Sequence, residues 1–254
     1  MLLVMDVGNT NTVLGVYQGD RLEHHWRLAS LRDRTVDELG VMSRQLFALT
    51  NLDPAAIDAI VIASVVPPLS PALAAMSRSY FRVEPLFVEP GVRTGMPILY
   101  ENPQEVGADR IANSVAAFAR YGGPVLVVDF GTATTIDAVS SRGEYLGGAI
   151  APGVQISSEA LFEKAARLPR VAIRRPDRVI GRNTVQAMQS GLYFGYLGLI
   201  DGLLRRMQDE LGEPAKVVAT GGLAPVFAAE ADRFDAVDPN LTLEGLRLIY
   251  MRNR

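Results

Sequence analysis

The chain has 254 residues, of which 48% are hydrophobic and 21% charged, with a formal net charge of -3 and a pI near 5.5. This composition predicts a folded chain with one large core or two moderate ones, and it argues against nonspecific nucleic-acid binding, which usually needs a basic face. The absence of cysteine excludes disulfides, thiolate catalysis and thiolate zinc sites.

The first half of the chain predicts the element order β-β-β-α-β-α-β. Strands are expected over 2–7, 11–17 and 21–28, since short apolar runs alternate there with turn residues. An amphipathic helix is expected over 35–49. The rest of this half is a buried strand within 56–67, a helix over 71–80 and a strand within 83–88.

The second half predicts the same order again. Strands are expected over 125–129, 134–139 and 144–150, followed by a long helix over 184–211 and a strand that begins at 216. A short helix over 225–230, a strand over 234–237 and a final helix over 241–252 complete the chain. We therefore expect two similar α/β halves, 1–115 and 116–254, that arose by duplication.

Two aspartates stand at matching places in these halves. Asp6 ends the first apolar strand in "DVGNTNT", and Asp129 ends a later one in "DFGTATT". In each, a glycine at the second following position lets the backbone approach a ligand, and hydroxyl and amide groups after it can face phosphate oxygens. A carboxylate beside phosphates makes sense when it holds a cation such as Mg²⁺. The sequence therefore predicts two hairpins that grip one nucleotide across a cleft.

A plain hairpin turn is the competing interpretation of either aspartate taken alone, and the repetition favours the nucleotide site. A P-loop is excluded, because it needs a lysine directly after glycine and neither of the two lysines, Lys164 and Lys216, follows one. A dinucleotide-binding loop is not indicated either, since no GxGxxG motif occurs.

Two further segments carry candidate site residues. "VVATGGLAP", 217–225, has two glycines after a buried strand, which lets a flat ligand such as adenine lie against the backbone, although a plain strand-to-helix turn explains it equally well. "ENPQEVGADR", 101–110, enters a helix near Pro103. Asp109 there is either a favourable first-turn acid or the acceptor of a substrate proton, and Arg110 can bind an anion with its planar guanidinium.

These segments, with "GGAIAPG" at 147–153 and "GRNTVQAMQSG" at 181–191, together resemble type III pantothenate kinase over nearly the whole chain. The resemblance implies a duplicated ribonuclease-H-like fold, as in the acetate and sugar kinase, heat-shock chaperone and actin superfamily, with a nucleotide cleft between the halves. It implies ATP-dependent phosphorylation of the primary hydroxyl of pantothenate, the first step towards coenzyme A.

The resemblance also implies roles for single residues. Asp109 is similar to the family's general base, and Asp129 matches the position of an activating monovalent cation, K⁺ or NH₄⁺. Asp6 is expected to hold Mg²⁺ directly or through water. The ATP phosphates would be bound by Asp6, Val7, Gly8, Asn9, Thr10, Asn11, Thr12, Val13 and Thr132. Pantothenate would be bound by Tyr100, Gly107, Ala108, Asp109, Arg110 and Thr184.

The resemblance further implies a homodimer, and the apolar stretch 190–204 fits either an interface helix or an internal one. No apolar run approaches the ~20 residues of a membrane span, so we expect a soluble cytoplasmic protein with no membrane or nucleic-acid partner. A sugar or acetate kinase and a non-catalytic regulator of gene expression are the alternatives. A coupled assay that offers ATP with pantothenate, hexoses or acetate separates them.

Overall fold

The computed structural model describes residues 1–228 and 233–254, which form two compact units. The first unit comprises Met1–Met96, Glu101–Ala116 and Leu241–Arg254, and the second comprises Pro97–Tyr100 and Ala117–Asn240. Each unit is built on one five-stranded sheet.

The first sheet has the strand order β3-β2-β1-β4-β5. The strands β1 (Leu2–Val7), β2 (Asn11–Gln18) and β3 (Arg21–Ala29) form an antiparallel meander. On the other side of β1, β4 (Ala59–Ser64) and β5 (Leu86–Phe87) continue the sheet in parallel. The carboxyl ends of β1 and β4 therefore lie next to each other, with Val7 opposite Ser64.

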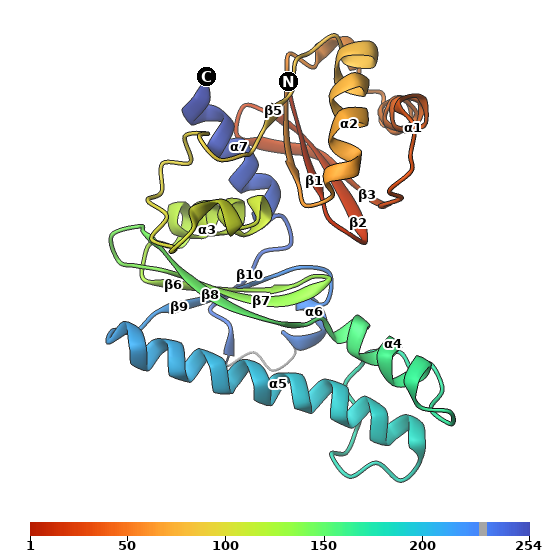
Figure 1. Cartoon of the computed structure of the whole chain (residues 1–254), viewed down its shortest axis with the longest axis vertical. Coiled ribbons are helices and arrows are strands. Elements are labelled where there is room, and N and C mark those ends of the chain that lie inside the picture. The colour runs from red at the N-terminus through yellow and green to blue at the C-terminus, as the bar shows by residue number, and fades with distance from the viewer. Residues whose placement is uncertain (229–232) are drawn as a thin grey trace. The chain divides into compact units, whose positions relative to one another are not determined.

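Helices cover both faces of the first sheet (Figure 1). Leu3, Met5 and Val7, at alternate positions of β1, join the buried cluster that also holds residues of α1 (Val36–Leu49) and α2 (Ser70–Met76). On the opposite face, Gly15 of β2 leaves room for Leu243 of α7 (Leu241–Asn253), which packs on β1 and β2. Asp6 belongs by alternation to this second face. The 3₁₀ turns of this unit are Pro54–Ala56, Pro67–Leu69 and Pro103–Glu105.

The second sheet repeats the first, with the order β10-β9-β6-β7-β8. The strands β6 (Val125–Phe130), β7 (Ala133–Val139) and β8 (Tyr145–Pro152) form the antiparallel meander. Then β9 (Lys216–Thr220) pairs in parallel with β6, and β10 (Ala236–Val237) with β9. Read from its other edge, β8-β7-β6-β9-β10, the second sheet has the same strand order as the first. This agreement confirms the predicted duplication.

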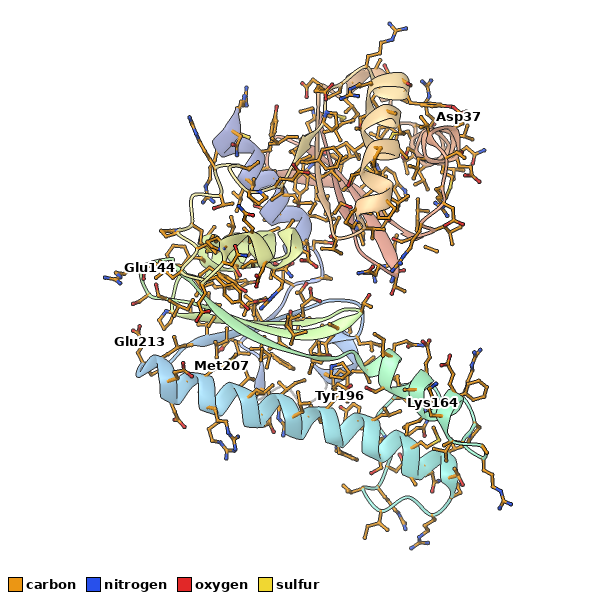
Figure 2. The ribbon with its side chains drawn as sticks, viewed as in Figure 1. Asp37, Glu144, Lys164, Tyr196, Met207 and Glu213 are labelled. Atoms are coloured by element: carbon orange, nitrogen blue, oxygen red, sulfur yellow. The ribbon has the colours of Figure 1, made fainter. Side chains whose placement is uncertain are left out.

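The second core lies between this sheet and α5 (Thr184–Leu211), which runs along one face of it (Figure 1). Leu126, Val128 and Phe130 of β6 point into this core, where Phe130 stacks on Phe227 of α6 (Ala224–Phe227) with ring centroids 4.7 Å apart. Figure 2 shows Tyr196 of α5 pointing towards the strands, where its hydroxyl donates to the Pro152 carbonyl at 2.8 Å. Asp129, between core positions of β6, belongs to the opposite face.

The structure corrects several expected elements. The helix expected over 71–80 is α2, which continues as a π-helical turn over Ser77–Phe81. The expected helix 225–230 is α6, and its last two positions lie outside the described residues. The helix α4 (Val154–Lys164) was not predicted, because Val154 and Ser158 are its only buried residues and its apolar spacing is weak.

The final helix also changes the expected division into 1–115 and 116–254. Residues of α7 pack on β1, β2 and β4, so this helix belongs to the first unit although it follows the second along the chain. No described helix is both long enough and apolar enough to span a membrane.

Candidate active site

The first hairpin carries Asp6 at the end of β1, half-buried and paired with Val13 of β2 and Ala63 of β4. The backbone turns sharply after it, since the Gly8 N–H donates to the Asn11 carbonyl at 3.0 Å. The side chains of Asn9 and Thr10 at the tip of this turn are exposed. The hairpin therefore presents polar groups to solvent directly beside a carboxylate.

Neighbouring residues fix this hairpin. The Ser30 N–H donates to the Thr10 carbonyl at 2.9 Å, and Arg32 donates to the side chain of Asn9 at 3.3 Å. Thr12 is 7% exposed, and its hydroxyl is hydrogen-bonded to that of Ser30 at 2.8 Å. The Thr12 hydroxyl thus supports the hairpin from below, whereas Asn9 and Thr10 face outwards.

Asp109 lies in the first turn of α3 (Ala108–Tyr121). The helix begins later than its predicted entrance at Pro103, because Asn102 caps a separate 3₁₀ turn and Val106 is extended. One carboxylate oxygen of Asp109 accepts the Arg110 N–H at 2.8 Å. Its second oxygen has no hydrogen-bond partner among the described residues.

The start of α3 packs at the carboxyl edge of the first sheet. A Cβ at Gly107 would collide with a carboxylate oxygen of Asp109 and would lie 3.8 Å from the side chain of Val65. Val65 directly follows β4 and donates to the Val7 carbonyl at 3.0 Å. The structure therefore places Asp109 and the Asp6 hairpin at the same edge of this unit. Arg110, the residue after Asp109, is buried, with 8% of its surface exposed.

The second hairpin repeats the arrangement around Asp129. This half-buried aspartate is paired with Thr135 of β7 and Thr220 of β9, and Thr132 at the turn is exposed. Thr134 does not join the group of outward-facing hydroxyls expected from the sequence. It is 2% exposed, because it shares its face of β7 with Ile136 in the core.

Two glycines press against this second hairpin. Gly221, with φ +90°, lies so close that a Cβ there would collide with a carboxylate oxygen of Asp129 and with the Phe130 backbone. A Cβ at Gly153, just before α4, would collide with the Thr132 carbonyl and would lie 3.0 Å from the Gly131 carbonyl oxygen. The segments 217–225 and 147–153 thus meet at Asp129 and its turn. Sequence reasoning missed the role of Gly153, because only the tertiary contact reveals it.

The remaining predicted substrate contacts, Tyr100 and Thr184, lie apart within the second unit. The Tyr100 ring packs against Gly147 near the start of β8, 3.4 Å from the position of a Cβ there. Thr184, at the start of α5, lines an open groove with Leu161 of α4. Figure 1 shows α4 leading away from the far end of β8, which is roughly 20–25 Å long. One copy of this unit does not bring the two residues together.

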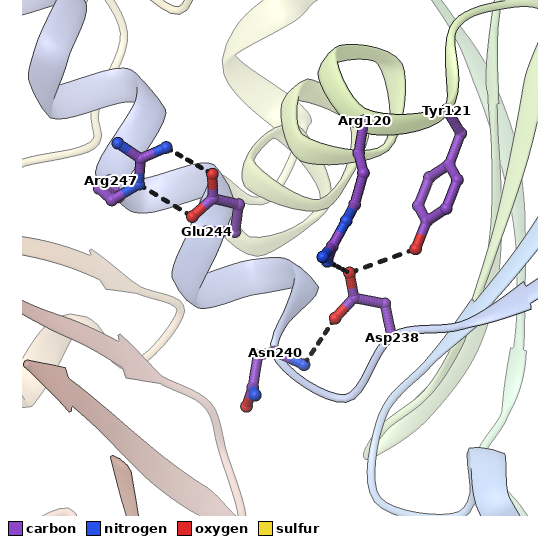
Figure 3. A network of polar contacts seen from close by, with 6 residues as sticks. All are labelled: Arg120, Tyr121, Asp238, Asn240, Glu244 and Arg247. Carbon is purple, nitrogen blue, oxygen red and sulfur yellow. Dashed lines mark hydrogen bonds and ion pairs between the residues drawn. The ribbon is translucent and has the colours of Figure 1, made fainter. Parts of the chain in front are cut away.

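Within the second unit, a buried carboxylate ties the end of α3 to the chain that follows β10 (Figure 3). Asp238 is 5% exposed and accepts Arg120 at 2.6 Å, the Asn240 N–H at 3.1 Å and the Tyr121 hydroxyl at 3.4 Å. Burial, together with this carboxylate, raises the pKa of Tyr121. These contacts hold the last turn of α3 against the chain of the second unit.

The described residues contain no group of three or more acidic or histidine side chains that could form a protein-only metal site. The single carboxylate of Asp6 beside an exposed polar turn instead fits Mg²⁺ that arrives with a nucleotide. Such Mg²⁺ is usually held by one or two carboxylates, phosphate oxygens and water.

Comparisons with known proteins agree with this arrangement. The family model of type III pantothenate kinase matches residues 2–206. A type III pantothenate kinase of Myxococcus xanthus is 61% identical, with 100% of this chain and 99% of that protein aligned. One from Geobacillus kaustophilus is 54% identical, with 100% of this chain and 98% of that protein aligned.

Solved structures with low sequence identity share the fold. A Baf family transcriptional activator from Campylobacter jejuni, 23% identical, superposes with a TM-score of 0.62 over 99% of this chain and 98% of its own. MreB 5 of Spiroplasma citri, 10% identical, superposes with a TM-score of 0.57 over 98% and 96%. These likenesses confirm the duplicated, actin-like architecture.

Proposed function

The chain belongs to the type III pantothenate kinase family, which phosphorylates pantothenate with ATP in coenzyme A biosynthesis, and we propose that Asp109 is the general base of this reaction. The observation that carries this proposal is the position of Asp109 at the same sheet edge as the Asp6 hairpin. Its engaged oxygen fixes the carboxylate on the helix, and its second oxygen can accept the proton of the pantothenate hydroxyl.

The Asp6 hairpin supports the phosphate end of this chemistry. We assign the ATP phosphates to 6–13 and Thr132, with Asp6 as the residue that holds Mg²⁺ directly or through water. Bound Mg²⁺ would neutralise the phosphate charge. The hairpin amides and the exposed polar side chains would orient the phosphates, since phosphoryl transfer depends on alignment and charge stabilisation.

Pantothenate is an anion, so its pocket requires a cationic or hydrogen-bonding partner. We assign that role to Arg110, with Tyr100, Gly107, Ala108, Asp109 and Thr184 as further contacts. We assign Asp129 to the monovalent cation, K⁺ or NH₄⁺. The cysteine-free chain suits a reducing compartment, and we place the reaction in the cytoplasm.

We also propose a homodimer, because Tyr100 and Thr184 lie at different ends of one unit yet are assigned to one substrate. A second copy that contributes its own Thr184 resolves this. The exposed apolar side chains around α4 and the start of α5, here the α4–α5 surface, supply an area to bury. They are Ile156, Leu161, Phe162, Val179, Ile180 and Val185.

A coupled assay of ADP release tests the reaction and the base together. The wild-type chain should turn over pantothenate, with hexoses and acetate inactive as acceptors. Asp109→Asn should lower kcat by about 10²–10⁴-fold, because the amide cannot take the proton. Asp58→Asn, an exposed acid at the far end of β4, is the matched control. Turnover of Asp109→Asn near the wild-type level would remove Asp109 from the base role.

A further inference from the structure

The segment that carries Tyr100 is fastened to the start of β8 at a single residue. The Leu99 N–H donates to the Tyr145 carbonyl at 2.8 Å, and the Tyr145 N–H donates to the Pro97 carbonyl at 2.9 Å. Ile98 forms a parallel bridge with Tyr145. Tyr145 therefore fixes the backbone immediately before Tyr100 through one hydrogen bond on each side of Ile98 along the chain.

The side chains continue this contact. The rings of Tyr100 and Tyr145 lie 6.3 Å apart between centroids, at 55° to each other. Gly147, with φ +126°, leaves room for the Tyr100 ring on the neighbouring part of β8. Tyr100 is half-buried, whereas Tyr145 is fully buried, so Tyr145 forms the floor on which Tyr100 rests.

The Tyr145 ring is held in turn by a buried carboxylate. Its hydroxyl donates to Asp137 of β7 at 2.7 Å, and the other carboxylate oxygen accepts the Thr135 hydroxyl at 3.4 Å. Asp137 is 0% exposed. A carboxylate so deeply buried is expensive to desolvate, and an apolar residue on a buried strand would cost less.

We propose that Tyr145 and Asp137 are positioning residues of the pantothenate site, which act by holding Tyr100 in the orientation that contacts the substrate. This inference rests on the proposed contact between Tyr100 and pantothenate. The Asp137–Tyr145 hydrogen bond fixes the ring orientation of Tyr145, and that ring together with the backbone bridge fixes Tyr100. The desolvation cost of the buried Asp137 carboxylate is thus offset by a well-defined pantothenate pocket.

Steady-state kinetics of three variants test the proposal. Tyr145→Phe keeps the ring and removes the hydroxyl, and Asp137→Ala removes its acceptor. Both should raise KM for pantothenate about tenfold and leave KM for ATP within about twofold. The reason is that each variant loses one hydrogen bond to a charged group, and that bond supports only the pantothenate pocket. Asp137→Asn keeps an oxygen acceptor and should restore KM towards the wild-type value.

Tyr121→Phe is the matched control, because it also removes a phenol hydroxyl from a buried aspartate of the same unit (Figure 3). It should leave KM for pantothenate unchanged. Thermal unfolding of all variants, measured in parallel, reports any general loss of stability. An unchanged pantothenate KM in Tyr145→Phe, or equal rises in both KM values, would overturn the proposal.

A double-mutant cycle separates this inference from the proposed function. If Tyr145 acts through Tyr100, Tyr145→Phe should have no further effect on pantothenate KM in a Tyr100→Ala background. An unchanged KM in Tyr100→Ala itself would refute the assigned contact. A normal KM in Tyr145→Phe beside a raised one in Tyr100→Ala would refute only the positioning role.

Discussion

Asp129 is the residue whose surroundings most resemble those of Asp6, and we assign it to a different cation. Its carboxylate lies under Gly221, at the meeting point of three segments of the second unit. Asp129→Ala should abolish stimulation by K⁺ while the basal rate in Na⁺ persists. Initial rates in matched K⁺ and Na⁺ buffers measure this, with Asp177→Ala, an exposed acid of the same unit, as the control. Retained K⁺ stimulation in Asp129→Ala would contradict the assignment.

A comparison of Gly221 with Gly212 separates two reasons why alanine at a glycine position would lower stability, namely side-chain crowding and backbone conformation. Both have positive φ, but a Cβ at Gly212 would meet nothing within 4 Å, whereas one at Gly221 would strike Asp129 and the Phe130 backbone. Gly212→Ala should cost about 1 kcal/mol of unfolding free energy, and Gly221→Ala roughly 2–4 kcal/mol. Urea unfolding of both variants checks the difference. Equal losses would show that Gly221 is not crowded.

At the scale of one element, α1 begins with a reciprocal capping box. The Thr35 N–H and hydroxyl donate to Glu38 at 2.8 and 3.0 Å, and the Glu38 N–H donates back to Thr35 at 3.2 Å. The backbone hydrogen bond, followed by the hydroxyl, lowers the pKa of Glu38. Ionised Glu38 therefore stabilises the fold above its unfolded pKa of about 4.3, and this contribution is lost as the pH falls through the lower folded value.

Glu38→Gln should consequently be less stable than the wild type at pH 7, and the difference should close in acid, below about pH 4. Urea midpoints at several pH values measure the gap. Glu213→Gln, an exposed glutamate after α5, should show no such gap at any pH. A difference that persists undiminished at pH 3 would mean that the Glu38 charge has no part in the cap.

Element types were predictable wherever periodicity was strong. The meanders 2–29 and 125–150 alternate or run apolar between clear turns, and α5 starts at a capping Asn183 and ends at Gly212 with φ +71°. The start of α3 and the existence of α4 were not predictable. The first depends on the extended Val106, and the second on contacts made by a mostly exposed helix.

At the scale of the whole molecule, the proposed dimer depends on the α4–α5 surface. Ile180→Glu should convert the dimer to a monomer and lower activity, since each pocket would lose the partner's Thr184. Leu49→Glu is the control, because Leu49 is 80% exposed in the first unit and Ile180 is 83% exposed in the second. Light scattering coupled to size-exclusion chromatography gives the mass. A dimer that survives Ile180→Glu would exclude this surface.

The repetition of the two aspartate hairpins was visible in the sequence, because both motifs follow buried strands in the same order of elements. Their supports were not visible. Gly153 approaches the Thr132 turn through a tertiary contact, and Asp137 holds Tyr145 across the β7–β8 pair, so neither support follows from a motif. Sequence motifs thus identified the candidate ligand-binding groups, whereas the residues that hold them became visible only in the folded structure.

The return of α7 to the first unit gives the chain a particular order of assembly. A ribosome releases the whole of 117–240 before it releases the helix that covers one face of the β1–β4 pair. Until then the Asp6 strand has one apolar side uncovered, while the later sheet already has all its strands. During synthesis the earlier sheet is therefore the one that needs protection from aggregation.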